Sequence, residues 1–547
     1  MRSIRALRTT NRAAGQPSTR PGLTDKPSHS AWQSRGSSAK WRQRQGDLMH
    51  KAIATGCAAA LLAAGVLALA PGAPVAAQGA AQGAAQEAPK EANAEPAVHI
   101  TASEDAVGNW TVTYRFAEPQ TALVLSQAPV TYREWEPLSE GVSMWRIGGM
   151  EGFVFDEPAQ EARFRIDTYS EDIPAAYTPF LAFSDGSYGV LTGQFRVKPI
   201  GSLDEARAFD GTGESWPQAV MTSRVSIGSP RPITPSENGV HSVDPGVSDG
   251  TYIYIGDLAP VEGSSFSGFV DPGMPEWLSN GFDRDLGVIF SQLSQGWGIE
   301  LEDKARVFLV FRGLEGDGLF MTGGAIGSLL SLEMGGSQLA EPIPEIRTYV
   351  RWFIAHEAAH VFQQAAGNSD VLFSASEHAW VHEGSANTFS YRIGASLADD
   401  PQGFLKESYA AEYRDCVAHL GQAPLVDARE MGNFRAYYAC GDLIALATDA
   451  MLPDHDLYDF WRAYQAASET AAGATRAQLY FGVLRDLGAP EEGVERLKSF
   501  VAEKPEDAAA FVEEMMAHFG LPIAFDENGE FAGITLRAAT DRKALHD

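Results

Sequence analysis

His-Glu-Ala-Ala-His at residues 356–360 and Trp-Val-His-Glu-Gly at residues 380–384 are the two stretches that decide the fold of this 547-residue chain. On a helix, residues four positions apart lie one above the other, so the imidazoles of His356 and His360 can face one metal ion. Glu357 is rotated by one residue and reaches a water molecule bound to that metal. The two stretches therefore predict a zinc centre for hydrolysis.

The residues around the first stretch have the pattern of a helix. Pro344 stands where the first residue of a helix is favoured, and Gly367 follows as a stop signal. Apolar side chains recur at helical spacing between them, namely Ile346, Tyr349, Val350, Phe353, Ile354 and Val361. The sequence thus predicts one helix with the two histidines well inside it.

A catalytic zinc needs a third protein ligand, with the fourth position open to water. Four side chains compete for this role: Glu377, His378, His382 and Glu383. Ser374 and Glu377 have the spacing of a capping box, which gives Glu377 a structural role at a helix start. Because successive helical residues point about 100° apart, His382 and Glu383 cannot both face the metal. The residue pattern alone leaves the choice open.

Trp-Val-His-Glu-Gly-Ser-Ala at residues 380–386 resembles the W-L-x-E-G-x-A signature of gluzincin metallopeptidases, specifically the alanyl and glycyl aminopeptidase families. The resemblance implies that Glu383 is the third zinc ligand beside the two histidines. Tyr-Tyr-Ala-Cys-Gly at residues 437–441 is similar to the Y-x-x-G segment of these families, whose tyrosine donates a hydrogen bond to the tetrahedral oxyanion. The resemblance implies this role for Tyr438.

The chain departs from the family pattern in three places. The loop before Glu383 is a few residues longer, and His382 stands where asparagine is usual. The strand that normally carries the G-x-M-E-N motif reads Gly-Gly-Ala-Ile-Gly at residues 323–327. It lacks the glutamate that grips the free amino terminus of a substrate, so the resemblance leaves the choice between aminopeptidase and endopeptidase open.

Two segments before the zinc helix, residues 306–311 and 319–332, have the composition of β-strands. Gly323, Gly324 and Ala325 lie at the centre of the second segment, where small residues let a substrate approach the backbone. An extended peptide could add to this edge as another strand. The alternative is an ordinary sheet with its glycines at a bulge.

The implied chemistry is hydrolysis of a peptide bond in a peptide or protein substrate. Zn²⁺ held by two neutral imidazoles and one carboxylate lowers the pKa of its bound water toward neutrality. Glu357 takes the proton as general base and passes it to the leaving amine, while zinc and Tyr438 share the charge of the oxyanion. Two alternatives are a catalytically inactive secreted binding protein on a peptidase fold and a zinc hydrolase of non-peptide bonds.

The chain is expected to have an α+β fold. Three regions follow one another: a β-sandwich-like domain at 98–235, a thermolysin-like catalytic domain at 236–470, as the resemblance implies, and a mostly helical region at 471–547. Frequent short strands such as residues 110–114 indicate the sandwich. Further elements are predicted by pattern: helices at 275–294, 476–487 and 505–518, and a hairpin around 526–529.

The first 97 residues lack the pattern of a folded domain. Residues 1–48 contain ten basic and two acidic residues without an apolar period, which indicates a disordered extension or a mis-set translation start. Residues 49–77 have the basic start, apolar run and small-residue end of a signal peptide, and a linker occupies residues 78–97. We expect export to the periplasm or the extracellular space, cleavage near Ala77 and no stable membrane anchor.

Charge and cysteine content bound the partners and the compartment. Without residues 1–77, 31 Lys and Arg stand against 69 Asp and Glu, a formal net charge of −38. Such a surface repels nucleic acid and anionic membranes, so nucleic-acid binding is excluded. Cys416 and Cys440 are the two cysteines of this part. In an oxidising compartment we expect a disulfide between them, the alternative being two buried thiols.

Overall fold

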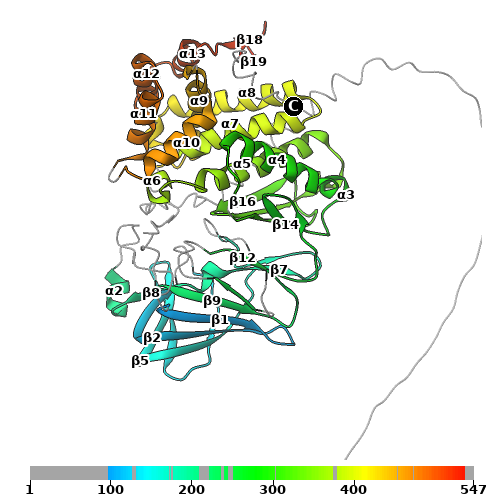
Figure 1. Ribbon diagram of the computed structural model, residues 1–547, viewed down its shortest axis with the longest axis vertical. Coiled ribbons are helices and arrows are strands. Elements are labelled where there is room, and N and C mark those ends of the chain that lie inside the picture. The colour runs from blue at the N-terminus through cyan, green and yellow to red at the C-terminus, as the bar shows by residue number, and fades with distance from the viewer. Residues whose placement is uncertain are drawn as a thin grey trace, which may run out of the picture. The chain divides into compact units, whose positions relative to one another are not determined.

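The computed structural model describes residues 96–535, except residues 126–130, 172, 174–176, 209–220, 236–239, 244–249, 302, 374–377, 453 and 472–473. The expected N-terminal extension, the signal peptide, the linker up to residue 95 and the capping box at 374–377 therefore lie outside the described residues. The described part combines β-sheets with a helical region that follows them, which confirms the α+β class (Figure 1). No helix of this part is long and apolar enough to cross a membrane.

Two β-sheets make up the N-terminal region. The first contains β1 (Val98–Glu104), β2 (Trp110–Leu125), β3 (Glu136–Pro137), β4 (Val142–Ile147), β5 (Met150–Ile166), β8 (Val197–Ile200), β9 (Ser223–Gly228) and β11 (Val240–Val243). The second contains β6 (Phe180–Ala182), β7 (Tyr188–Leu191), β10 (Ile233–Thr234) and β12 (Tyr252–Ile255). Strands follow the order β11-β9-β1-β2-β5-β3 in the first sheet and β10-β12-β7-β6 in the second. A short helix, α2 (Leu203–Ala208), follows β8.

The two sheets share one apolar core, as expected for a β-sandwich. Alternate residues of β1 are buried, so one face of the first sheet is apolar. Trp110 of this sheet packs edge-on against Phe180 of the second, with ring centroids 5.4 Å apart. Because β11 pairs with β9 and β12 pairs with β7, the sheets extend past the boundary expected at residue 235.

A third sheet precedes the helical part. It consists of β13 (Val261–Glu262), β14 (Phe266–Val270), β15 (Ala305–Phe311), β17 (Leu329–Gly335) and β16 (Phe320–Ile326), in that order. β14, β15 and β17 are parallel, whereas β16 is antiparallel to β17 and forms the edge. The predicted segment at 306–311 is confirmed as β15, and the segment at 319–332 covers two antiparallel strands, β16 and β17, with a turn at residues 327–328. Pairing of β16 is regular along its whole length, so the alternative of a bulge at Gly323 and Gly324 is wrong.

The single helix predicted at residues 275–294 is wrong in one respect. Two helices, α3 (Glu276–Ser279) and α4 (Phe282–Trp297), occupy this stretch. Gly281 lies between them with φ at 93°, a left-handed conformation that a right-handed helix cannot contain. The chain therefore turns at this glycine, and α4 packs against the helix that carries His356 and His360.

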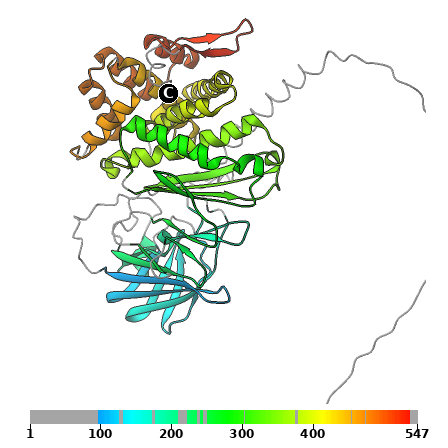
Figure 2. The same ribbon diagram turned by 45° about the vertical axis from the view of Figure 1, so that its right-hand side comes forward.

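The zinc motif lies on α5 (Pro344–Gln364), which begins at the proline that the sequence indicated. Seventeen of its 21 residues are buried, so this helix runs through the core and not along the surface. It contacts β16 and β17 on one side and α7 (Trp380–Leu397) on another (Figure 2). A short helix, α6 (Ser369–Phe373), lies between α5 and α7 in the chain.

Next in the chain, α8 (Pro401–Leu420) and α9 (Arg435–Met451) complete the surroundings of α7. α7 and α9 lie so close together that both contact positions require glycine. A Cβ on Gly384 would be 2.0 Å from the carbonyl carbon of Gly441, and a Cβ on Gly441 would be 2.6 Å from the backbone oxygen of Trp380. This contact brings the turn of α7 that carries Glu383 against the turn of α9 that carries Tyr438.

The C-terminal region contains α10 (Leu457–Ser468), α11 (Arg476–Asp486), α12 (Glu491–Ala502), α13 (Ala508–His518) and a hairpin of β18 (Ile523–Phe525) and β19 (Phe531–Ile534). The two predicted helices and the hairpin are confirmed. α12 was not predicted, although Val494, Leu497 and Val501 recur at helical spacing. Buried side chains from Phe266 to Leu521 form one continuous core, so these helices pack on the same core as α5.

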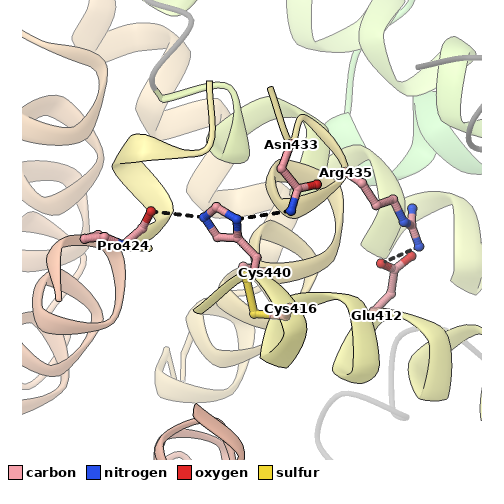
Figure 3. Close-up of a disulfide and its surroundings, with 7 residues drawn as sticks. Glu412, Cys416, Pro424, Asn433, Arg435 and Cys440 are labelled. Atoms are coloured by element: carbon pink, nitrogen blue, oxygen red, sulfur yellow. Dashed lines mark hydrogen bonds and ion pairs between the residues drawn. A yellow bond between two sulfur atoms is a disulfide. The ribbon is translucent and has the colours of Figure 1, made fainter. Parts of the chain in front are cut away.

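Cys416 of α8 and Cys440 of α9 form a disulfide at the contact of these two helices (Figure 3). Both residues are fully buried. Beside them, Asn433 donates a hydrogen bond of 3.1 Å to Nδ1 of His419, whose Nε2 donates to the carbonyl of Pro424 at 3.0 Å. The expected pairing is thus confirmed, and the alternative of two free thiols is wrong.

Replacing both cysteines with serine should destabilise the fold. Closing a loop of this size contributes about 3 kcal/mol in the chain-entropy model. Guanidinium denaturation of the full-length C416S/C440S protein should give a free energy of unfolding lower than wild type by about that amount, and a reductant should shift only the wild-type curve. Coincident curves for the variant and the unreduced wild type would contradict the role of the bond.

Candidate metal centre

Three side chains from α5 and α7 converge on one point. Nε2 of His356 lies 3.1 Å from Nε2 of His360 and 3.2 Å from Oε2 of Glu383. The same carboxylate oxygen is 3.2 Å from Nε2 of His360. Donor atoms around a tetrahedral zinc with bonds of about 2.05 Å are about 3.3 Å apart, so two nitrogens and one oxygen at this spacing fit the ion.

The helical spacing explains how the two imidazoles meet, and packing holds the first of them. Tyr438 stacks its ring on that of His356, with centroids 5.6 Å apart and an interplanar angle of 29°. Trp352, one turn earlier on α5, packs against the same imidazole with centroids 6.0 Å apart. Tyr438, whose role was implied by the family resemblance, therefore lies at the cluster.

A buried glutamine orients the second imidazole. Nε2 of Gln363 donates to the backbone oxygen of His382 at 3.0 Å, so its Oε1 faces His360. Nδ1 of His360 lies 2.7 Å from this oxygen and must carry the proton that it donates. In the neutral ring Nε2 of His360 is then the unprotonated nitrogen, the one that a metal can bind. Sequence reasoning missed Gln363, although a glutamine one turn after the second histidine on a buried helix was a signal.

His382 lies beside the cluster without joining it. Its Nδ1 accepts a hydrogen bond of 2.9 Å from Nη1 of Arg476, and its Nε2 is 3.4 Å from Oε1 of Glu383. Burial lowers the pKa of His382 to about 4, so the ring is neutral at pH 7. The donor atoms that lie within 4.8 Å of one another belong to His356, His360 and Glu383. Of the candidates that the pattern left open, Glu383 is the one whose carboxylate lies in the cluster.

The carboxyls of the site have opposite electrostatic environments. Burial raises the pKa of Glu357, although His356 and His360 oppose the rise. Burial would also raise the pKa of Glu383, but His360 and His382 outweigh it and hold this pKa well below the usual range. A carboxylate whose pKa is raised toward neutrality can both accept and release a proton, whereas one with a depressed pKa stays charged.

The edge strand β16 packs against α5, the helix that carries both histidines. The backbone N–H of Gly327 donates a hydrogen bond of 2.9 Å to Oε1 of Gln364 at the end of α5. This bond joins the residue after β16 to the last residue of α5.

The three residues predicted to contact substrate differ in exposure. Gly323 is exposed, whereas Gly324 and Ala325 are half-buried. A Cβ at position 324 would lie 2.6 Å from the hydroxyl oxygen of Tyr177, the end of a flexible side chain, whereas a Cβ at position 323 would lie 2.2 Å from the backbone oxygen of Ser331, so position 323 requires glycine. The structure therefore brings the strand to the site and explains one glycine by packing.

The comparisons with known proteins concern the fold. No protein-family model and no curated protein sequence matches this chain. An aminopeptidase N family protein from Idiomarina loihiensis is similar in structure with a TM-score of 0.57 and 13% identity, over 79% of this chain and 81% of that one. This similarity confirms the fold that the gluzincin resemblance implied.

Two further solved structures are more distant. The M1 zinc metallopeptidase from Deinococcus radiodurans gives a TM-score of 0.38 at 15% identity, over 75% of this chain and 92% of that one. Yeast LTA4 hydrolase in complex with bestatin gives a TM-score of 0.40 at 12% identity, over 75% of this chain and 68% of that one. Both TM-scores lie below 0.5, so neither structure establishes a shared fold on its own.

We expect zinc affinity to depend on Gln363 and not on its neighbour. Gln363→Ala removes the acceptor that fixes His360 and should lower zinc affinity about 10–100-fold, the usual effect of losing such a partner. Gln364→Ala is the matched control, because its side chain bonds Gly327 instead. Competition with a chelator on the full-length proteins measures both constants. Equal affinities for the two variants would contradict the proposed orientation of His360.

Proposed function

We propose that this protein is a zinc-dependent peptidase that hydrolyses peptide bonds. The observation that carries the proposal is the convergence of the donor atoms of His356, His360 and Glu383 on one point. Glu357 is buried and directly follows His356 in the sequence, which is the position of the general base in the H-E-x-x-H motif of metallopeptidases. The fold shared with an aminopeptidase N family protein supports the same conclusion.

The donor set of two imidazoles and one carboxylate fits zinc with a position left open for water. When bound, zinc would act as a Lewis acid that lowers the pKa of a water molecule. Glu357 would accept the proton of that water on a carboxylate oxygen as the water oxygen bonds to the carbonyl carbon. As the C–N bond breaks, Glu357 would deliver the proton to the departing nitrogen. Tyr438 would donate its O–H to the carbonyl oxygen while negative charge develops there.

The substrate that best fits this arrangement is an extended peptide or protein segment. β16 is the edge strand of its sheet and packs against α5, and a peptide could pair with this edge along Gly323, Gly324 and Ala325. Position 326 is isoleucine, where the related motif has glutamate. This strand therefore offers no charged partner to the amino group of a substrate, and recognition of a free amino terminus would need another group.

We also infer that the protein acts outside the cytosol. The leader pattern of residues 49–77 predicts export. The disulfide between Cys416 and Cys440 supports this inference, because such bonds persist in oxidising compartments.

Glu357→Gln should abolish peptide hydrolysis while zinc remains bound. The amide keeps the size of the side chain but cannot accept the proton, and the three ligands are untouched. Activity on peptides with free and blocked amino termini, measured together with zinc content, tests this expectation. Glu345→Gln at the exposed start of α5 is the control and should behave as wild type. Hydrolysis by a zinc-loaded E357Q protein would overturn the assigned mechanism.

Tyr438→Phe should lower kcat about 10²–10³-fold, the usual loss when one oxyanion donor is removed, without loss of zinc. Tyr437→Phe is the matched control, because the hydroxyl of Tyr437 accepts a hydrogen bond from the backbone N–H of Arg429. Steady-state kinetics on one peptide compares the two variants. If kcat of Y438F equals that of Y437F, the hydroxyl of Tyr438 does not stabilise the oxyanion.

A further inference from the structure

A chain of three polar side chains connects the C-terminal helices to the metal-binding cluster. Arg476, the first residue of α11, is 2% exposed. Its Nη1 lies 2.9 Å from Nδ1 of His382, whose Nε2 lies 3.4 Å from Oε1 of Glu383. The other oxygen of that carboxylate, Oε2, is the one that faces His356 and His360 at 3.2 Å.

The chemistry of arginine fixes the proton on His382. A guanidinium has five N–H donors and no acceptor, so Nδ1 of His382 must be the unprotonated nitrogen. The proton of the neutral ring then sits on Nε2, the nitrogen that lies 3.4 Å from Oε1 of Glu383. Arg476 thereby makes His382 a donor toward one defined oxygen of Glu383.

The His382 ring is also held by packing. Phe373 meets it edge-on, with ring centroids 5.2 Å apart and an interplanar angle of 74°. Arg476 donates a second hydrogen bond of 3.4 Å to the backbone oxygen of His378, in the turn before α7. A capping box between Thr475 and Gln478 fixes the start of α11, where Arg476 lies. The donor to Glu383 is therefore fixed on a rigid support.

We propose that Arg476 and His382 are positioning residues of the metal centre. Arg476 orients His382, and His382 occupies Oε1 of Glu383, which leaves Oε2 for the metal. This inference rests on the proposed zinc site. A carboxylate with one oxygen engaged by a donor binds a metal through its other oxygen. The carboxylate is then held against rotation and does not offer both oxygens to the metal. The C-terminal helical region thus completes the metal centre through Arg476, which lies 94 positions after its partner His382 in the sequence.

Two other roles for His382 fit the distances less well. As a ligand it would need a free nitrogen, but Nδ1 is occupied by Arg476 and the compact donor cluster does not include it. As a packing residue it would not need two polar partners, and a buried apolar side chain would serve better.

The test compares two replacements of one residue on the full-length protein. His382→Leu removes the donor at similar volume, whereas in His382→Gln the side-chain amide can stand near the position of Nε2 and donate to Glu383. We expect H382L to bind zinc about 10–100-fold more weakly than wild type and H382Q to recover most of the loss. Glu383→Ala should bind zinc more weakly than either variant, since it removes a ligand.

A second pair of variants tests the arginine. Arg476→Leu should weaken zinc binding as H382L does, and Arg485→Leu, on the exposed face of the same helix, should not. The visible spectrum of the cobalt-substituted proteins gives a readout that general loss of stability does not move. We expect altered bands for H382L and wild-type bands for H382Q and R485L.

The outcomes separate this inference from the proposed function. Wild type that binds no zinc overturns both. Wild type that binds zinc, with H382L equal to it in zinc affinity and cobalt spectrum, overturns only the positioning role. If H382L and H382Q lose affinity equally, the donor to Glu383 is irrelevant and the inference is wrong. Thermal unfolding in a chelator shows whether each variant is folded without metal. If R476L is not folded, the comparison of H382L with H382Q still decides the test.

Discussion

The contact between Gly384 and Gly441 is the constraint on which the metal centre depends. A side chain at either position would meet the backbone of the other helix, with Cβ distances of 2.0 Å and 2.6 Å to the nearest atoms. Backbones this close leave no freedom in the relative position of α7 and α9. Glu383 precedes one glycine by one residue, and Tyr438 precedes the other by three. The glycines of both motifs therefore act by setting the distance between two functional side chains.

The burial of α5 imposes a second constraint, because polar groups inside a core must find partners. This helix carries its histidines among Val, Phe, Ala and Trp side chains that are nearly all buried. Gln363 resolves the problem for His360, and Gln465 donates in turn to the backbone oxygens of Phe362 and Gln363 at 2.9 and 3.1 Å. The polar chain that begins at the metal position thus continues into α10. For His360, satisfying the buried polar group and orienting the ligand are one and the same arrangement, whereas Nδ1 of His356 is buried without a hydrogen-bond partner among the described residues.

The sequence predicted the features that depend on local patterns and missed those that depend on distant residues. Helical spacing placed His356 and His360 together, and a strand rich in glycine was correctly expected at the sheet edge, because both are local patterns. Gly281 interrupts the helix predicted at residues 275–294, because its left-handed backbone conformation cannot be part of a right-handed helix. Arg476 was missed for a different reason, because its role depends on a partner 94 positions away and no periodicity reports such a pair.

The boundary expected at residue 470 marks a change in sequence pattern, yet the core does not change there. Side chains of α10, α11, α12 and α13 belong to the same continuous core as those of α4, α5 and α7. Arg476 of α11, beyond this boundary, donates to His382 of α7 at 2.9 Å, so a polar contact also crosses it. Regions that share a core are expected to unfold together. The helices after residue 470 are therefore part of the structure that holds the metal ligands, and loss of their packing should reach Glu383 through Arg476 and His382.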